Sequence, residues 1–91
     1  MSFIKDIFEK IKTEIDENLK DMRVFVDDIS FETEGTYKFL RIVLDKPGGL
    51  DLDAIVEASK IINPLIDKYD LGEDSYILDI LSKEIGDVNN G

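Results

Sequence analysis

The sequence predicts a small α+β domain in which two helices pack on one face of a three-stranded sheet. Its 91 residues give room for a single hydrophobic core. Along the chain, the spacing of apolar residues is typical of a helix, two strands, a second helix and a third strand, in that sequence. This gives the order α-β-β-α-β. Placing both helices on one face gives every apolar stripe a partner. We expect residues 1–85 to form this one domain and residues 86–91 to be a flexible tail.

The first helix is predicted over about residues 3–20, with Ser2 placed to cap its first amides. Its apolar positions recur at three- and four-residue spacing, which is typical of one side of a helix. They are Phe3, Ile4, Ile7, Phe8, Ile11, Ile15 and Leu19. The opposite side mixes lysines with acidic residues, whereas a membrane-surface helix carries mostly Lys and Arg there. We therefore expect this helix to pack on the domain's own sheet.

Two strands are predicted next, over residues 23–32 and 37–45, because β-branched and aromatic residues and alternation dominate there. The polar stretch 32–36 contains a glycine and is typical of a hairpin connection, so these strands are expected to pair antiparallel. A third strand is predicted over residues 76–82. The sequence leaves open whether it pairs with the first strand or with the second.

The segment Asp45–Gly49 carries the strongest turn signal of the chain. Pro47 presets φ for the first central position of a type II turn, and Gly48 supplies the positive φ that the next position needs. Asp51 is then predicted to be a helix N-cap. Asp53 falls in the first turn of that helix, where the helix dipole favours a negative charge.

The second helix is predicted over about residues 52–62. Pro64 lacks an amide hydrogen and clashes with the preceding turn, so an unbroken helix is not expected to continue through it. Asn63 and Pro64 are instead expected to cap and begin a separate short turn.

Composition restricts the chemistry of the chain. Eleven basic and twenty-one acidic side chains give a net charge of −10, and the chain has no Cys and no His. A zinc site built from Cys and His, a thiol nucleophile and an imidazole base are therefore excluded. The charge opposes phosphate binding, so we expect no base-specific binding of nucleic acid. No stretch resembles a signal peptide or a membrane span, and we expect a cytoplasmic protein without a membrane partner.

Half of the net charge lies in residues 70–91. Two interpretations stay open: a solvated loop and tail, or an acidic surface for a basic partner.

Three acidic pairs are candidates for metal or acid–base chemistry, and we expect none of them to form such a site. They are Asp27–Asp28, Asp51 with Asp53, and Glu73–Asp74. No segment has the alternating oxygen ligands and closing Glu of a calcium loop. A phosphate cradle at Gly48–Gly49 would lack the P-loop lysine, and the neighbouring aspartates would repel the anion. We therefore expect no metal, no cofactor and no enzyme activity.

Aromatic and basic residues alternate on one strand face, at Tyr37, Phe39 and Arg41. Such a face superficially suggests a platform for stacking bases. We favour an ordinary outer sheet face with one charge, because no basic stripe accompanies the aromatic residues.

Three segments, in order and spacing, resemble one known family. They are Phe39-Leu-Arg-Ile-Val-Leu-Asp-Lys-Pro-Gly-Gly-Leu-Asp-Leu-Asp53, Glu57-Ala-Ser-Lys60 and Tyr76-Ile-Leu-Asp-Ile-Leu-Ser82. The chain resembles the N-terminal domain of the ribosome maturation factor RimP family, over about residues 20–82. In that family a strand ends in Asp-Lys-x-Gly-Gly and is followed by a capping Ser or Thr, an aliphatic residue and Asp. Asp51 stands here in place of the Ser or Thr and keeps the capping role.

The sequence departs from the family after Ser82, where the family continues with Pro-Gly into a second, small β-barrel domain. Here Lys83 and Glu84 follow, and the second domain is not present in the sequence. The two interpretations are a fragment and a natural single-domain relative. The replaced Pro and Gly favour a single-domain relative.

The resemblance implies a non-catalytic factor for maturation of the small ribosomal subunit, with a basic ribosomal protein or the immature small subunit as partner. We expect the partner-binding residues where the resemblance is concentrated: Asp45, Lys46, Gly48, Gly49, Asp51 and Asp53. The alternative for this segment is a turn with a helix cap and no partner. The alternatives for the chain are a stand-alone protein interaction module and a small metal-dependent enzyme. The sequence does not predict the oligomeric state.

Overall fold

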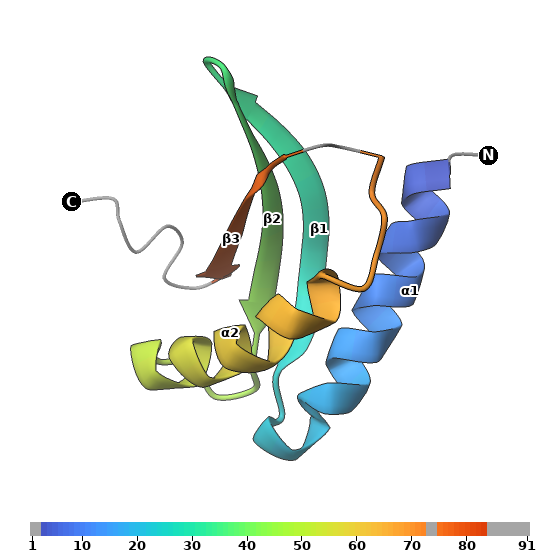
Figure 1. The fold of residues 1–91 in the computed structure, drawn as a ribbon. Helices are drawn as coiled ribbons and strands as arrows, with labels where there is room; N and C mark the ends of the chain where they lie inside the picture. The colour runs from blue at the N-terminus through green and yellow to red at the C-terminus, as the bar shows by residue number, and fades with distance from the viewer. Residues whose placement is uncertain (1–2, 73–74, 84–91) are drawn as a thin grey trace.

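The computed structural model describes residues 3–72 and 75–83 and confirms the predicted fold class and element order. Its elements are α1 (Phe3–Asn18), a 3₁₀ turn (Lys20–Met22), β1 (Phe25–Glu34), β2 (Tyr37–Asp45), α2 (Leu52–Ile66) and β3 (Ile77–Ser82). Figure 1 shows α2 lying across the sheet and α1 running alongside β1. The predicted cap Ser2 and the predicted tail over residues 86–91 lie outside the described residues.

The sheet has the order β1-β2-β3, so the central strand is β2. β1 pairs with β2 antiparallel, as the hairpin signal predicts. β3 pairs with β2 in parallel, with Ile42 opposite Ile80, and the amide of Lys83 continues this ladder by donating to the Leu44 carbonyl at 2.8 Å. The structure thus settles the partner of the third strand, which the sequence pattern leaves open.

Both helices bury their apolar sides against the same face of the sheet. The core positions of α1 are Ile11 and Ile15, and those of β2 are Leu40, Ile42 and Leu44. The remaining buried hydrophobic residues are Leu19, Val24, Val26, Leu50, Ile55, Ala58, Ile62, Leu65, Ile66 and Leu71. The period of two in β2 therefore leaves the alternate side chains on the face that carries no helix.

The hairpin between β1 and β2 is tighter than the sequence predicts. The strands extend to Glu34 and from Tyr37, so only Gly35 and Thr36 form the turn. Gly35 has φ of 63°, as the first central position of a type II′ hairpin requires. The polar residues of the predicted connection over 32–36 belong mostly to β1, because its outer side faces solvent.

The passage from α1 into β1 also differs slightly from the prediction. α1 ends at Asn18 and a 3₁₀ turn follows, so the helix is shorter than the predicted 3–20. Arg23 adopts a left-handed conformation with φ of 62°, which cannot continue an extended strand. β1 therefore begins at Phe25, two residues later than predicted.

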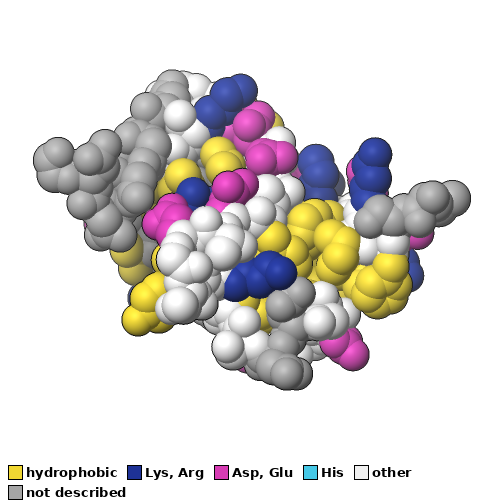
Figure 2. Space-filling model, turned by 90° about the horizontal axis from the view of Figure 1, so that it is seen from above, with side chains coloured by type: hydrophobic (Ala, Val, Ile, Leu, Met, Phe, Trp, Pro, Cys, Tyr) yellow, Lys and Arg dark blue, Asp and Glu magenta, His cyan; other side chains and the backbone are white. Residues whose placement is uncertain are grey.

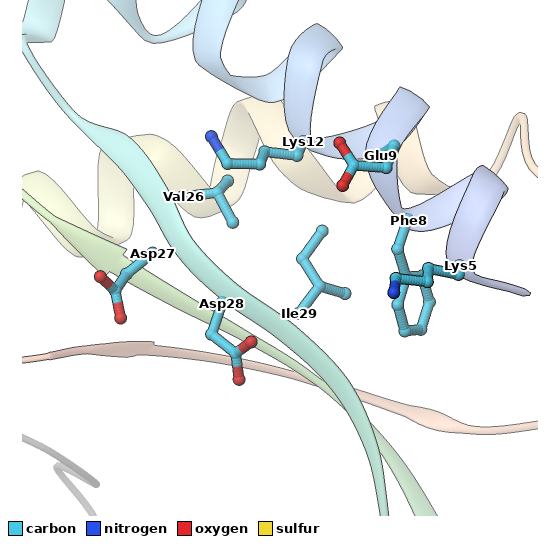
Figure 3. A pocket seen from close by; sticks show the side chains of 8 residues that line it. All are labelled: Lys5, Phe8, Glu9, Lys12, Val26, Asp27, Asp28 and Ile29. Atoms are coloured by element: carbon cyan, nitrogen blue, oxygen red, sulfur yellow. The ribbon is translucent and has the colours of Figure 1, made fainter.

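β1 contains a β-bulge between Val26 and Asp28. In Figure 3, Val26 and Ile29 lie on the side of β1 that faces α1, whereas Asp27 and Asp28 both point away from it. A bulge adds one residue against the partner strand, and here it sends two consecutive carboxylates to the same side. The backbone amide of Val26 donates to Asp16 Oδ1 of α1 at 2.8 Å, which ties the helix to the strand at the bulge.

The prediction that the second helix ends near residue 62 is wrong. α2 is continuous over Leu52–Ile66 with Pro64 inside it, and Asn63 does not cap a new turn. Instead, Asn63 Nδ2 donates to the Ser59 carbonyl at 2.9 Å. The proline lies in the last turn, where few backbone bonds remain to be lost. Burial of Leu65 and Ile66 in the core favours keeping that turn helical.

Candidate protein-binding site

The loop from β2 to α2 forms the type II turn that the sequence predicts. The amide of Gly49 donates to the Lys46 carbonyl at 2.9 Å and closes the turn. Gly48 has φ of 88°, although a Cβ at this position would meet no atom within 4 Å. Backbone conformation, and not lack of space, therefore favours glycine there. Asp45 accepts a hydrogen bond from the Lys46 amide at 2.8 Å, which fixes the start of the turn.

Asp51 caps α2 as predicted. Its backbone is extended, with φ of −92° and ψ of 173°, and its Oδ1 accepts a hydrogen bond from the amide of Ala54 at 2.8 Å. Asp53 lies exposed in the first helical turn. Just before the cap, Leu50 is buried and anchors the loop to the core. A rigid turn thus presents the two aspartates at the start of α2.

Two exposed aliphatic residues stand beside these aspartates, and none of the sequence motifs includes them as exposed positions. Leu52 is 56% exposed and Val56 is 52% exposed, one turn apart on α2. The sequence does contain a signal for their exposure, because both residues fall outside the apolar stripe of α2 that includes Ile55 and Ala58. We name Asp51, Leu52, Asp53 and Val56 together the α2 surface.

The surroundings of the α2 surface carry charges of both signs. Glu57 follows in the same exposed stretch and forms an ion pair with Lys60 at 3.4 Å. Lys46 is the cation of the preceding turn. The α2 surface thus places two carboxylates beside two exposed apolar side chains.

A shallow hollow of about 310 Å³ lies elsewhere, between α1 and the bulge of β1 (Figure 3). Its charged lining mixes Lys5 and Lys12 with Glu9, Asp27 and Asp28. The carboxylates do not face one another: in Figure 3, Glu9 lies on the helix side and the two aspartates point away from it. The hollow therefore lacks the opposed carboxylates that acid–base catalysis on a shared substrate requires.

The two acidic pairs that lie in the described residues are not brought together by the fold. Asp27 and Asp28 lie on β1, whereas Asp51 and Asp53 lie at the start of α2. Within residues 3–72 and 75–83, no group of three or more acidic side chains is placed to hold a metal ion. The third pair, Glu73 and Asp74, lies outside the described residues.

Basic side chains are dispersed on the face shown in Figure 2. There, the Lys and Arg residues are separated from one another by acidic, hydrophobic and other surface, and they form no continuous stripe. A nucleic-acid backbone requires clustered cations. This face is therefore unsuited to phosphate binding.

The RimP N-terminal domain family matches residues 8–83, which is most of the chain. The chain belongs to the RimP N-terminal domain family. One similar curated protein is the ribosome maturation factor RimP of Parafrankia sp. (strain EAN1pec), which is 37% identical over 49 residues. These residues make up 54% of this chain and only 16% of that relative.

The match to the RimP N-terminal domain places the site residues within the family's domain. Residues 8–83 include the turn, the cap and the α2 surface. None of the helices in the described part of the chain is long and apolar enough to cross a membrane.

Proposed function

We propose that this chain acts in maturation of the small ribosomal subunit as a non-catalytic binding domain, with a basic ribosomal protein, free or in the immature subunit, as its partner. Membership of the RimP N-terminal domain family carries the proposal. A similar curated protein bears the name ribosome maturation factor.

The net charge supports a protein partner within the ribosomal particle over its RNA. A chain with a net charge of −10 is repelled by phosphates and attracted by basic proteins. The same attraction accelerates encounter with a basic partner and weakens as salt increases.

The α2 surface supports a contact that combines charge with apolar burial. Leu52 and Val56 are each more than half exposed, so each has apolar area left to bury against a partner. Asp51 is already engaged as a cap, whereas Asp53 is exposed and forms no ion pair with any residue in the described ranges 3–72 and 75–83, so it can face a cation of the partner. The turn residues Asp45, Lys46, Gly48 and Gly49 hold this surface in place.

Co-sedimentation with immature small ribosomal subunits tests the proposal. We expect association at low salt that is lost as salt increases. The double substitution Leu52→Ser with Val56→Ser is expected to weaken it at least severalfold without unfolding the domain, because both side chains are largely exposed. Asp53→Lys is expected to weaken it as well, through charge reversal on the α2 surface.

Matched controls separate a specific site from general effects. Phe3→Ser removes an exposed hydrophobic residue from α1, where the side chain is 65% exposed, and Glu17→Lys reverses an exposed charge there. Both are expected to leave the association unchanged. Absence of association at any salt concentration would overturn the proposed function and favour a stand-alone interaction module. Equal losses in control and site variants would overturn the α2 surface as the contact.

A further inference from the structure

The face of the sheet opposite the helices is uncovered, and we call its side chains the open face. Figure 1 shows both helices on the same side of the sheet. The strand register then places the side chains that alternate with the core positions on the other side. They are Asp28, Ser30, Glu32 and Glu34 of β1, Tyr37, Phe39, Arg41 and Val43 of β2, and Ile77, Asp79 and Leu81 of β3.

The half of the open face formed by β2 and β3 is largely apolar. Phe39 pairs with Ile77, and Val43 pairs with Leu81 in the parallel ladder. Ile77 is 45% exposed, and the other three side chains are half-buried. The two apolar pairs lie on either side of the Arg41–Asp79 pair, and each has apolar area left to bury.

The half formed by β1 is acidic. Asp28, Glu32 and Glu34 follow one another along the outer edge of the sheet, and the bulge adds Asp27 to the same side (Figure 3). Asp28 and Glu32 lie about 13 Å apart along the strand, at the usual rise per residue. Throughout residues 3–72 and 75–83, no basic side chain forms an ion pair with Asp28 or Glu32.

The cations of the open face are already engaged with its own acids. Arg41 Nη2 lies 2.5 Å from Glu34 Oε2, and its Nε lies 3.1 Å from Asp79 Oδ2. Its guanidinium also stacks over Phe39, 5.3 Å from the ring centre. Lys83, just after β3, reaches Asp27 on β1 at 3.3 Å. These pairs brace the three strands and leave the β1 side with an excess of negative charge.

We propose that the open face binds a basic amphipathic segment of a protein partner, with its apolar side on β2 and β3 and its basic side along β1. The proposal deepens the proposed function and rests on it for the choice of a basic protein, and it makes the open face a second contact, separate from the α2 surface. Charge complementarity selects this occupant: an RNA strand would be repelled by β1, and an acidic peptide likewise. An apolar peptide without cations would give the carboxylates of Asp28 and Glu32 no ionic partner.

Amide chemical shifts of the ¹⁵N-labelled chain test the proposal with a soluble peptide built from Lys and Leu, with Lys along one side. We expect the peptide to shift the amides of Phe39, Val43, Ile77 and Leu81. Substituting Asp28→Lys with Glu32→Lys is expected to weaken binding about tenfold, since two attractive charges become repulsive. The milder pair Asp28→Asn with Glu32→Gln provides the same test if charge reversal disturbs the strand.

A matched control variant changes net charge by the same amount elsewhere. The control carries Glu17→Lys at the end of α1 together with Asp21→Lys in the following turn. We expect this variant to bind the peptide as tightly as the unaltered chain does. A peptide with Glu in place of Lys and a single-stranded RNA are expected to cause no shifts on the open face. Equal weakening in both charge variants, shifts confined to α2, or stronger binding of RNA would overturn the proposal.

The two proposals fail in different ways. If the chain sediments with immature subunits but the peptide shifts no open-face amide, the binding surface proposed here is wrong and the proposed function stands. If the peptide binds the open face but the chain never sediments with subunits, the open face is supported as a binding surface and the proposed role in ribosome maturation is wrong.

Discussion

At the scale of single residues, Glu14 is the best-defined electrostatic feature. It lies on α1 and accepts hydrogen bonds from Lys68 Nζ and from the Tyr69 hydroxyl, the latter at 2.5 Å. These two hydrogen bonds, of which the one from Lys68 has the larger effect, hold the pKa of the Glu14 carboxyl below its ordinary value. The same contact raises the pKa of Tyr69, chiefly because its hydroxyl is bonded to the Glu14 carboxylate. The residues are more than fifty positions apart, so no sequence pattern predicts this contact.

The lowered pKa predicts a specific dependence of stability on pH. A carboxyl whose pKa is lower in the folded state stabilises the fold at pH above its unfolded pKa, and this contribution is lost as the pH falls through the folded pKa. Lys68→Ala removes the main cause, so the pKa of Glu14 should rise in that variant. A ¹³C NMR titration of the Glu14 carboxyl measures it. Lys60→Ala, which breaks only the exposed pair with Glu57, serves as control, and an equal shift in both variants would contradict the assignment.

Asp16 connects α1 to β1 through two contacts. Its Oδ1 accepts the Val26 amide and its Oδ2 pairs with Lys12, both at 2.8 Å. Asp16→Ala leaves the Val26 amide without its acceptor, and we expect the free energy of unfolding to fall by about 1–2 kcal/mol. Asp16→Asn keeps an acceptor oxygen and should lose less. Urea denaturation of both variants measures this, and identical losses would show that the bond to Val26 is not the cause.

At the scale of elements, the start of α2 serves structure whether or not it also binds a partner. Asp51→Ala removes the cap from the Ala54 amide and is expected to destabilise the domain by about 1 kcal/mol, whereas Asp51→Ser should retain most of the stability. Thermal denaturation followed by circular dichroism measures both. If the serine variant is as unstable as the alanine variant, the cap does not contribute through this hydrogen bond.

Features of the elements that depend on local chemistry were predictable from sequence. The turn around Gly48 and the cap at Asp51 need only neighbouring residues, and both are as predicted. The end of α2 is not predictable from Pro64, because the rule for proline is local, whereas burial of Leu65 and Ile66 in the core decides where the helix ends. The exposure of Leu52 and Val56 is predictable in principle, because both are apolar residues outside the buried stripe of α2.

At the scale of the whole molecule, the decisive features join distant parts of the chain. The pairing of β3 with β2 creates the contact between Arg41 and Asp79, and it brings Lys83 to Asp27. None of these follows from sequence spacing, since they depend on which strand β3 joins. The open face is likewise a product of topology, because it exists only once three strands lie side by side. The negative charge, by contrast, is evident from composition alone, and the topology determines where it is displayed.

The most direct test of the central claim separates the proteins of the immature small subunit from its RNA. The immobilised chain is offered the extracted proteins and the naked small-subunit RNA in turn, at low and at high salt. We expect it to retain one or a few basic proteins at low salt, to release them at high salt, and not to retain the RNA. Retention of the naked RNA in preference to the proteins would contradict the account.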